Sequence, residues 1–309
     1  MGIDPQFRLD EEKCVGCGLC TKVCEGLMLH INANGKVEIA DNDAWNGRGC
    51  WGCQHCMAVC PKGAISINGK DPDLCATPPG REIADLMDAL ILTRRSFRRY
   101  IDKPVDQALV QQLMRIMGNV PTGGNRQGVE YTVVTDPLVM KQLHDVVYTK
   151  MEENAAAGKL PSILSSSFYS FLKESEKTVR PDDLLFCSAP NLFIAHQEVP
   201  EGSVWGSDKA LECAVTTAYF ELLCAAHGLG AVIMSTPVGV FEMIPESYDI
   251  LGIPRNHVFG LVVGFGYPEI TYKRGVQRED GSAVHEVHYG YIDTYGRVGG
   301  HFAPDESLD

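Results

Sequence analysis

The sequence predicts an α+β protein of two domains, a small cysteine-rich domain followed by a larger one in which helices and strands form layers. The chain has 309 residues, which is more than a single hydrophobic core usually serves. Eight of its twelve cysteines lie between Cys14 and Cys60. Beyond residue 80, helical patterns alternate with short apolar runs that are typical of buried strands. We therefore expect domains at residues 1–75 and 81–309.

Charge and hydropathy exclude several classes of protein. The formal net charge of −13 disfavours nucleic acid and anionic membrane surfaces as partners. Residues 1–70 hold 7 basic and 8 acidic side chains, a net of −1 (7 − 8), which leaves −12 for the rest of the chain. No apolar run approaches the roughly 20 residues that span a bilayer, and the start lacks the features of a secretory signal. We therefore expect a cytoplasmic protein without a membrane partner.

The clustered cysteines repeat one spacing, C-x₂-C-x₂-C-x₃-C, at residues 14–24 and again at 50–60. The first run is followed by Glu25 and the second by Pro61, which leaves the number of ligands unchanged. This spacing resembles that of bacterial two-cluster ferredoxins, in which the fourth Cys of each run ligates the other 4Fe–4S cluster. The expected ligands are Cys14, Cys17, Cys20 and Cys60 for one cluster and Cys24, Cys50, Cys53 and Cys56 for the other.

Zinc is the alternative occupant of clustered cysteines. A structural zinc site uses four thiolates, often as two C-x₂-C pairs, and would leave the third and fourth Cys of each run without a role. Two complete runs therefore favour two 4Fe–4S clusters. Cys75 stands apart from both runs, and we expect it to be a small buried hydrophobe rather than a ninth ligand.

Turn residues and apolar spacing predict the remaining elements. Residues 31–40 alternate about Asn34-Gly35, which indicates a hairpin, and Pro78-Pro79-Gly80 marks the linker between domains. Ile83, Leu86 and Leu90 share one helical face. The other predicted elements are a helix over 109–117, a strand at 129–135, a helix opening at Pro137, a strand near 192–195, a helix over 208–227, a strand at 231–234, a helix over 241–251 and a strand at 258–265.

Three segments of the larger domain carry candidate binding chemistry. Residues 94–100 (RRSFRRY) combine guanidinium forks with a hydroxyl, which suits a phosphate, although basic residues at a helix end also complement its dipole. Residues 121–127 (PTGGNRQ) offer backbone and amide groups with little bulk, as any turn would. Residues 264–268 (GFGYP) lead to the basic stretch 272–278.

In this order the three segments resemble the FMN-dependent nitroreductase family, over roughly residues 81–280. The whole chain is similar to ferredoxin-fused members of that family. The resemblance implies a nitroreductase-type domain with a mixed sheet flanked by helices, bound FMN, and a homodimer with FMN at the subunit interface. It implies that Arg94, Ser96 and Arg274 hold the FMN phosphate and ribityl chain, and that Arg98 lies near the N1/O2 edge of the flavin ring.

The resemblance also implies residues from other loops. The further candidate FMN contacts are Arg95, Pro121, Thr122, Gly123, Asn125, Gln127, Ser235 and Thr236. The loop Pro121–Asn125 is expected to act from the other subunit. Two positions depart from the family pattern: Ser235-Thr236-Pro237 stands where two small or acidic residues are common, and Gly128 stands where proline often follows the loop glutamine.

Other features rank below these. The sequence lacks a G-x-G-x-x-G turn after a strand, so we expect no Rossmann site for NAD(P)H. His285 and His288 are expected at the surface, and the Gly-rich tail after Tyr291 is expected to fray or wrap a partner subunit. Aromatic residues that could cover a pocket, or simply belong to the core, are Phe168, Tyr169, Phe171 and Trp205.

Two functions are compatible with these motifs. In the first, a low-potential donor of ferredoxin or flavodoxin type reduces the clusters, the clusters reduce FMN, and FMN reduces a small acceptor such as a nitroaromatic or a quinone. In the second, the chain is an electron-transfer subunit that relays electrons to a partner protein. An accessible pocket over the flavin would favour the enzyme, and a covered flavin or a large apolar patch beside it would favour the relay.

Overall fold

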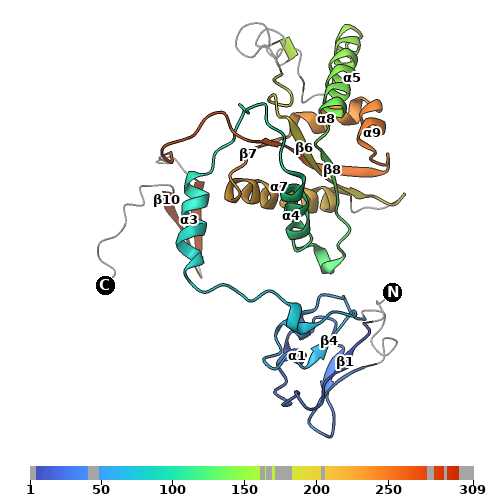
Figure 1. Cartoon of the computed structure of the whole chain (residues 1–309), viewed down its shortest axis with the longest axis vertical. Helices are drawn as coiled ribbons and strands as arrows, with labels where there is room; N and C mark the ends of the chain where they lie inside the picture. The colour runs from blue at the N-terminus through green and yellow to red at the C-terminus, as the bar shows by residue number, and fades with distance from the viewer. Residues whose placement is uncertain are drawn as a thin grey trace.

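The computed structural model describes residues 5–40, 49–160, 164, 169–170, 183–202, 206–276, 282–288 and 291–298. Within these ranges the α+β class is confirmed. A small N-terminal unit of short strands and one-turn helices precedes a larger unit in which helices cover both faces of a sheet (Figure 1). An extended segment connects the two (Figure 1).

The N-terminal unit contains two antiparallel strand pairs and two one-turn helices. Its elements are β1 (Arg8–Leu9), α1 (Leu19–Lys22), β2 (Leu29–Ile31), β3 (Val37–Ile39), α2 (His55–Ala58), β4 (Ile65–Ser66) and the 3₁₀ turn η2 (Pro72–Leu74). β2 and β3 form the hairpin predicted at Asn34-Gly35, and β1 pairs with β4. α1 and α2 occupy equivalent places in the two cysteine runs, so the unit has an internal twofold repeat.

The larger unit contains the elements that position the candidate site. They are α3 (Ile83–Thr93), α4 (Gln107–Met117), η3 (Gly123–Asn125), β5 (Glu130–Val134), α5 (Pro137–Ala156), β6 (Asn191–Glu198), α7 (Gly206–Ala226), β7 (Gly230–Met234), α8 (Thr236–Met243), α9 (Glu246–Leu251), β8 (His257–Gly266), β9 (Ser282–His288) and β10 (Tyr291–Val298). Four of these strands form an antiparallel sheet in the order β5-β6-β8-β7.

The sheet separates two hydrophobic cores. Along β6, Leu192 and Ile194 face one core while Phe193 and Ala195 face the other, as the two-residue period of a strand requires. The first core is closed by α5, α8 and α9, and the second by α4 and α7. All four side chains are fully buried, so β6 is the centre of the larger unit.

The predicted helix over 241–251 is wrong in its bounds. The structure has two helices there, α8 and α9, separated at Ile244, whose φ of −114° and ψ of 89° are not helical. Pro245 causes the break, because a proline disfavours the helical conformation of the residue before it.

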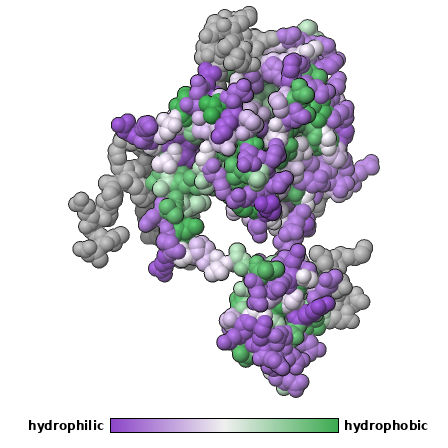
Figure 2. Space-filling model, viewed as in Figure 1, coloured by the Kyte–Doolittle hydropathy of each residue, from purple (hydrophilic) through white to green (hydrophobic). Residues whose placement is uncertain are grey.

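α3 keeps its predicted amphipathic pattern but buries none of its side chains within the described chain. Leu86 is 71% exposed, and Ile83 and Ile91 are about half exposed at 48% and 51%. α3 stands apart from the sheet in Figure 1, and Figure 2 shows hydrophobic side chains gathered on its surface. Exposed apolar patches of this kind mark association surfaces more often than solvated ones.

The C-terminal part of the described chain is an antiparallel hairpin of β9 and β10. It includes the start of the predicted tail, whereas residues beyond 298 lie outside the described ranges. Among the helices that the structure describes, none combines the length and apolar character needed to cross a bilayer.

Candidate functional site

The eight clustered cysteines surround two cavities of four cysteines each. The first cavity is lined by Cys14, Cys17, Cys20 and Cys60, and the second by Cys24, Cys50, Cys53 and Cys56. Each group therefore joins three cysteines of one run to the fourth Cys of the other. This arrangement supports two 4Fe–4S sites with exchanged fourth ligands.

The backbone around each cavity adopts conformations that bring it close to the thiols. Gly16 has a φ of 68°, and a Cβ atom there would lie 2.2 Å from the carbonyl oxygen of Gly35, so only glycine lets the β2–β3 hairpin close over the first loop. Gly18 precedes α1 with a φ of 71°. Gln54 takes the equivalent place before α2 with a φ of 62°, a left-handed conformation that is uncommon for a residue with a side chain.

Backbone N–H groups point at both of the exchanged thiols. The amide of Met28 lies 3.3 Å from Cys24 Sγ, and the amide of Ala64 lies 3.3 Å from Cys60 Sγ. Hydrogen bonds to sulfur stabilise its anionic form and help to set the potential of an iron–sulfur cluster. The two sites are therefore built alike at this ligand.

Burial, and to a lesser extent the charges of the neighbouring Cys53, Cys24 and Cys50, raise the pKa of the Cys56 thiol to about 12. Burial likewise raises the pKa of Cys20. A buried group of thiolates is stable only beside cations, which the iron of a cluster supplies. The donor set and its burial thus fit a cluster.

Cys75 corrects one expectation. It was predicted to be a buried hydrophobe, but it is exposed at the end of η2, next to Leu74, which is 84% exposed. The linker packs against too little of the chain to cover it. Cys187, Cys213 and Cys224 are the buried hydrophobic cysteines instead.

Arg94 is anchored by a carboxylate that the sequence analysis did not single out. Its Nη1 lies 2.6 Å from Oε1 of Glu221, on α7, and Glu221 is only 5% exposed. This ion pair engages Nη1 of the guanidinium group and fixes the plane of the group. The remaining N–H groups of the guanidinium can donate hydrogen bonds to an anion.

The side chain of Arg95 turns back toward the neighbouring backbone. A phosphate ligand would be expected to point outward instead. Its Nη1 and Nη2 donate to the carbonyl oxygens of Arg94 and Leu92, at 2.6 and 2.8 Å. Its buried Nε has no hydrogen-bond partner among the described residues. A Cβ on Gly275 would lie 3.0 Å from the carbonyl oxygen of Leu92, so the return segment that carries Arg274 lies against this turn.

Two further contacts join the return segment and β7 to residues 94–100. The rings of Phe97 and Tyr272 meet edge to face, with centroids 5.2 Å apart. The amide of Phe97 donates to the carbonyl oxygen of Ala231 at 2.8 Å, and Ser96 forms a parallel bridge with the same residue. The structure therefore brings together the segments of Arg94, Ser96 and Arg274, although they are far apart in the sequence.

The other residues predicted to bind the flavin together with Arg94 lie around the same edge of the sheet, the edge formed by β7. Arg98 and Arg274 are exposed, Ser96 is half-buried, and Ser235 and Thr236 lie where β7 ends and α8 begins. Ser235 makes no capping hydrogen bond, so its hydroxyl is not committed to the helix terminus. This edge offers cations, a hydroxyl and backbone amides to an anionic ligand.

The loop Pro121–Gln127 is held by a second carboxylate of α7. Oε1 of Glu212 accepts a hydrogen bond from the amide of Gly123 at 2.6 Å, and Thr122 Oγ1 accepts one from the amide of Gln127 at 2.9 Å. Asn125 and Gln127 both have positive φ, 52° and 50°. Strained residues of this kind gather at functional sites, and here they follow Gly123, the residue that Glu212 holds.

The same loop contacts the cysteine-rich unit. Asn125 Nδ2 donates to the carbonyl oxygen of Trp51 at 3.1 Å. Trp51 also lines the cavity of Cys24, Cys50, Cys53 and Cys56. A further cavity, of about 460 Å³, lies between residues 51–55 and 118–127. One of the two thiol cavities is therefore next to the predicted flavin-binding loop.

Glu212 and Glu221 place the two halves of the predicted flavin site on different sides of one helix. They are nine residues apart on α7, which puts them about 180° apart around the axis and about 13 Å apart along it. Within a single chain, the loop Pro121–Gln127 and the Arg94 segment therefore do not face one another.

Sequence reasoning missed three of these contacts, namely Arg94 with Glu221, Gly123 with Glu212 and Asn125 with Trp51. Glu212 and Glu221 looked like ordinary charged positions of an exposed helix face, and only their partners reveal their role. A Cβ on Gly128 would lie 2.6 Å from Nε2 of Gln197, so a larger residue there would require that side chain to move. Such contacts could be inferred from sequences only by finding pairs of positions that vary together among related proteins.

Of the remaining candidates, the structure describes Tyr169 and His285. Tyr169 packs against the core closed by α5, α8 and α9, whereas Phe168, Phe171 and Trp205 lie outside the described residues. His285 is exposed, as expected, and the side chain of His288 lies outside what the structure describes.

Comparisons with known proteins agree with both halves of the chain. A family model described as the nitroreductase family matches residues 91–267, more than half of the chain, and a 4Fe-4S dicluster domain matches residues 13–65. A putative NADH dehydrogenase/NAD(P)H nitroreductase of Archaeoglobus fulgidus is 25% identical over 184 residues, covering 58% of this chain and 84% of that protein. Ferredoxin-3 of a Nostoc species is 33% identical over 78 residues, covering 21% of this chain and 80% of that protein.

Solved structures are also similar. A nitroreductase with bound FMN from Bacteroides fragilis has a TM-score of 0.49 at 17% identity, covering 66% of this chain and 100% of that chain. One from Desulfitobacterium hafniense, also with bound FMN, has a TM-score of 0.49 at 19% identity, covering 63% and 96%.

The exchanged ligands can be tested with double cysteine variants. If Cys24 shares a cluster with Cys53, the double variant Cys24→Ala/Cys53→Ala damages one site only, and iron should fall from about eight to about four atoms per chain. Cys17→Ala/Cys24→Ala should damage both sites and remove nearly all iron. Iron analysis of anaerobically purified protein makes the comparison, with Cys75→Ala as the control. The reverse pattern would show that each run holds its own cluster.

Proposed function

Because the chain belongs to the nitroreductase family and carries a 4Fe-4S dicluster domain, it is an oxidoreductase, and we propose that it passes electrons from two clusters through FMN to a small acceptor. The observation that carries this proposal is the contact between Asn125 and Trp51, which joins the predicted flavin-binding loop to the wall of one thiol cavity. When bound, the clusters supply one-electron transfer and FMN supplies the step between one- and two-electron chemistry.

The residues at the edge of the sheet fit an FMN phosphate. Arg94 is oriented by Glu221, and the segment of Arg274 lies against the same turn. The buried Nε of Arg95 lacks an acceptor among the described residues, which is the condition expected beside an anion site. We assign the phosphate to Arg94, Ser96 and Arg274, with Arg95 holding the turn in place.

Other residues would bind the rest of the flavin. Arg98 is an exposed cation four residues after Arg94. Placed at the N1/O2 edge of the ring, it would stabilise negative charge there and raise the reduction potential. Ser235 and Thr236 lie at the start of α8, near the end of β7, where their amides can reach a ring held along the same edge.

The thiol cavity of Cys24, Cys50, Cys53 and Cys56 is proposed to be the one nearer the flavin. Trp51 lines this cavity and also lines the larger cavity beside the loop. The cavity of Cys14, Cys17, Cys20 and Cys60 would then receive electrons first, and Cys17 is exposed there. A reduced ferredoxin- or flavodoxin-type protein is the proposed donor.

A homodimer is proposed because a single chain does not close the flavin site. The loop Pro121–Gln127 and the Arg94 segment are anchored on opposite sides of α7, so the loop is proposed to serve the flavin of the partner subunit. α3 exposes its apolar face, and on α7 Leu211, Val215 and Tyr219 form an exposed stripe at i, i+4 and i+8. A partner subunit would cover both surfaces.

The relay function is less well supported. The cavity of about 460 Å³ beside the loop leaves room for a small acceptor, which favours the enzyme. The apolar face of α3 would serve the relay only if a different protein, and not a second copy, covered it. The assembly experiment below distinguishes the two.

The phosphate assignment predicts a loss of FMN affinity in Arg274→Ala. Removing one charge-assisted hydrogen bond should cost about 1.5–3 kcal/mol, which raises the FMN dissociation constant roughly 10- to 150-fold. Arg274 is the cleaner choice, because Arg94→Ala would also leave Glu221 buried without its cation. Flavin fluorescence titration measures the constant, with Arg115→Ala on α4 as the control and iron content unchanged in both. Equal affinities in the two variants would place the phosphate elsewhere.

The proposed dimer predicts that Leu86→Glu weakens assembly. Leu86 is 71% exposed in the single chain, so a charge there costs little unless another subunit covers it. Light scattering after gel filtration should show a shift toward monomer together with loss of FMN. Leu138→Glu on α5, which replaces a side chain that is 75% exposed, is the matched control and should remain dimeric. A wild-type monomer that keeps its full FMN would contradict the proposal.

The proposed path predicts that the clusters are required for donor-driven turnover. Reduced ferredoxin or dithionite should reduce the flavin much faster than NAD(P)H does. Cys17→Ala should slow this reduction while photoreduced flavin still reacts normally with its acceptor. Stopped-flow measurement of the two half-reactions separates the steps, and Cys75→Ala is the control. Unchanged donor-driven reduction in Cys17→Ala would remove the clusters from the path.

A further inference from the structure

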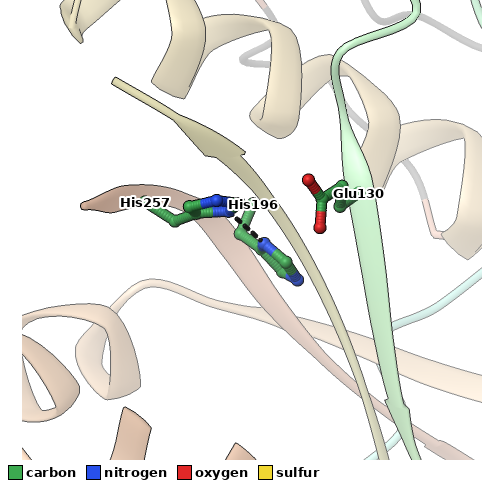
Figure 3. A group of neighbouring side chains, drawn as sticks. All are labelled: Glu130, His196 and His257. Atoms are coloured by element: carbon green, nitrogen blue, oxygen red, sulfur yellow. Dashed lines mark hydrogen bonds between the residues drawn. The ribbon is translucent and has the colours of Figure 1, made fainter. Parts of the chain in front are cut away.

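Three potential metal ligands meet at the end of the sheet that lies away from the Arg94 segment. Glu130 begins β5, His196 lies near the end of β6, and His257 begins β8 (Figure 3). Glu130 and His196 are register partners across the two strands. His257 lies eight residues before Phe265, which pairs with Ala231 at the flavin end, so the two ends of β8 are about 26 Å apart. The cluster is therefore separate from the Arg94 segment, whereas the loop Pro121–Gln127 ends three residues before Glu130.

The two imidazoles face each other inside the protein. His196 Nδ1 and His257 Nδ1 are 2.8 Å apart, and the residues are only 3% and 8% exposed. One potential ligand atom from each of the three side chains lies within 4.8 Å of the others. Glu130 is exposed, and Figure 3 shows its carboxylate beside His196, so its side chain has room to move toward the two rings.

The second nitrogen of His196 is already oriented. Its Nε2 lies 3.0 Å from Thr132 Oγ1, on the same strand as Glu130. In the tautomer that donates from Nε2 to Thr132, the Nδ1 lone pair faces His257, which is the usual arrangement around a metal-binding histidine. Burial, and then the proximity of His257, lowers the pKa of His196 to about 4, so the ring is neutral near pH 7.

We propose that Glu130, His196 and His257 form a binding site for a divalent transition-metal cation of the zinc type. Two imidazoles and one carboxylate are a donor set that zinc accepts, with a fourth position for water. Calcium and magnesium prefer sites made of oxygen ligands and are not expected to bind. The bound cation would join β5, β6 and β8 at one end of the sheet.

Binding requires only small movements. Ligand atoms about 2.1 Å from a tetrahedral metal lie about 3.4 Å from one another. The two Nδ1 atoms must therefore separate slightly, and the exposed carboxylate must approach. In the metal-free protein, the short Nδ1–Nδ1 contact is a hydrogen bond in which one ring is protonated at Nδ1. When the metal binds, that ring changes tautomer and carries its proton on Nε2.

The experiment measures zinc uptake by the full chain with its clusters assembled under anaerobic conditions, so that the eight clustered cysteines hold iron. The Cys75→Ala background removes the exposed thiol of the linker. Equilibrium dialysis against zinc should show one more zinc per chain in this protein than in the same protein carrying His257→Gln. Glu130→Gln, a change at an exposed position, should weaken binding on the order of tenfold or more.

His227→Gln is the matched control, because it removes an exposed histidine at the end of α7 and should leave zinc uptake unchanged. Cobalt(II) in place of zinc should give a spectrum without thiolate charge transfer. Equal zinc uptake in the His257→Gln and His227→Gln proteins would overturn the site, as would full affinity in Glu130→Gln. Since Glu130→Gln replaces a surface side chain, this test does not depend on whether His257→Gln folds.

Discussion

The arrangement of the larger unit depends on α7, a helix that is buried against the sheet and carries two carboxylates on opposite sides. Glu221 pairs with Arg94, and Glu212 accepts a hydrogen bond from Gly123. Because α7 packs through Phe220 onto Phe193 of β6, with ring centroids 4.0 Å apart, the helix that carries both carboxylates cannot shift without disturbing the core. The helix thus fixes where each candidate binding segment lies and which way it faces.

The sequence predicts those parts of the protein that depend on the spacing of residues along the chain. Thiol spacing indicates two clusters and their exchanged ligands, and apolar periodicity indicates most helices and strands. It does not predict contacts between distant residues, such as Arg94 with Glu221 or Asn125 with Trp51, because a single glutamate or tryptophan carries no signal for its partner. The break in the helix at Pro245 could have been predicted from the sequence, since proline disfavours the helical conformation of the residue before it. The exposure of Cys75 was not, because burial is set by the whole chain.

The two units differ in what holds them together. The N-terminal unit has few buried apolar side chains, and several of those that line its core cluster belong to the cysteines themselves. A unit of this size gains much of its stability from bound metal. The larger unit has two full hydrophobic cores and needs no cofactor for its packing. Loss of iron should therefore affect the first unit before the second.

The contact between Asn125 and Trp51 has a consequence for the dimer. The loop that touches the cysteine-rich unit is anchored on the side of α7 away from the Arg94 of its own chain. If that loop serves the partner's flavin, as proposed, then each set of clusters lies beside the flavin of the opposite subunit. Dilution would separate every cluster from the flavin it serves, so catalysis would depend on protein concentration even with free FMN in excess.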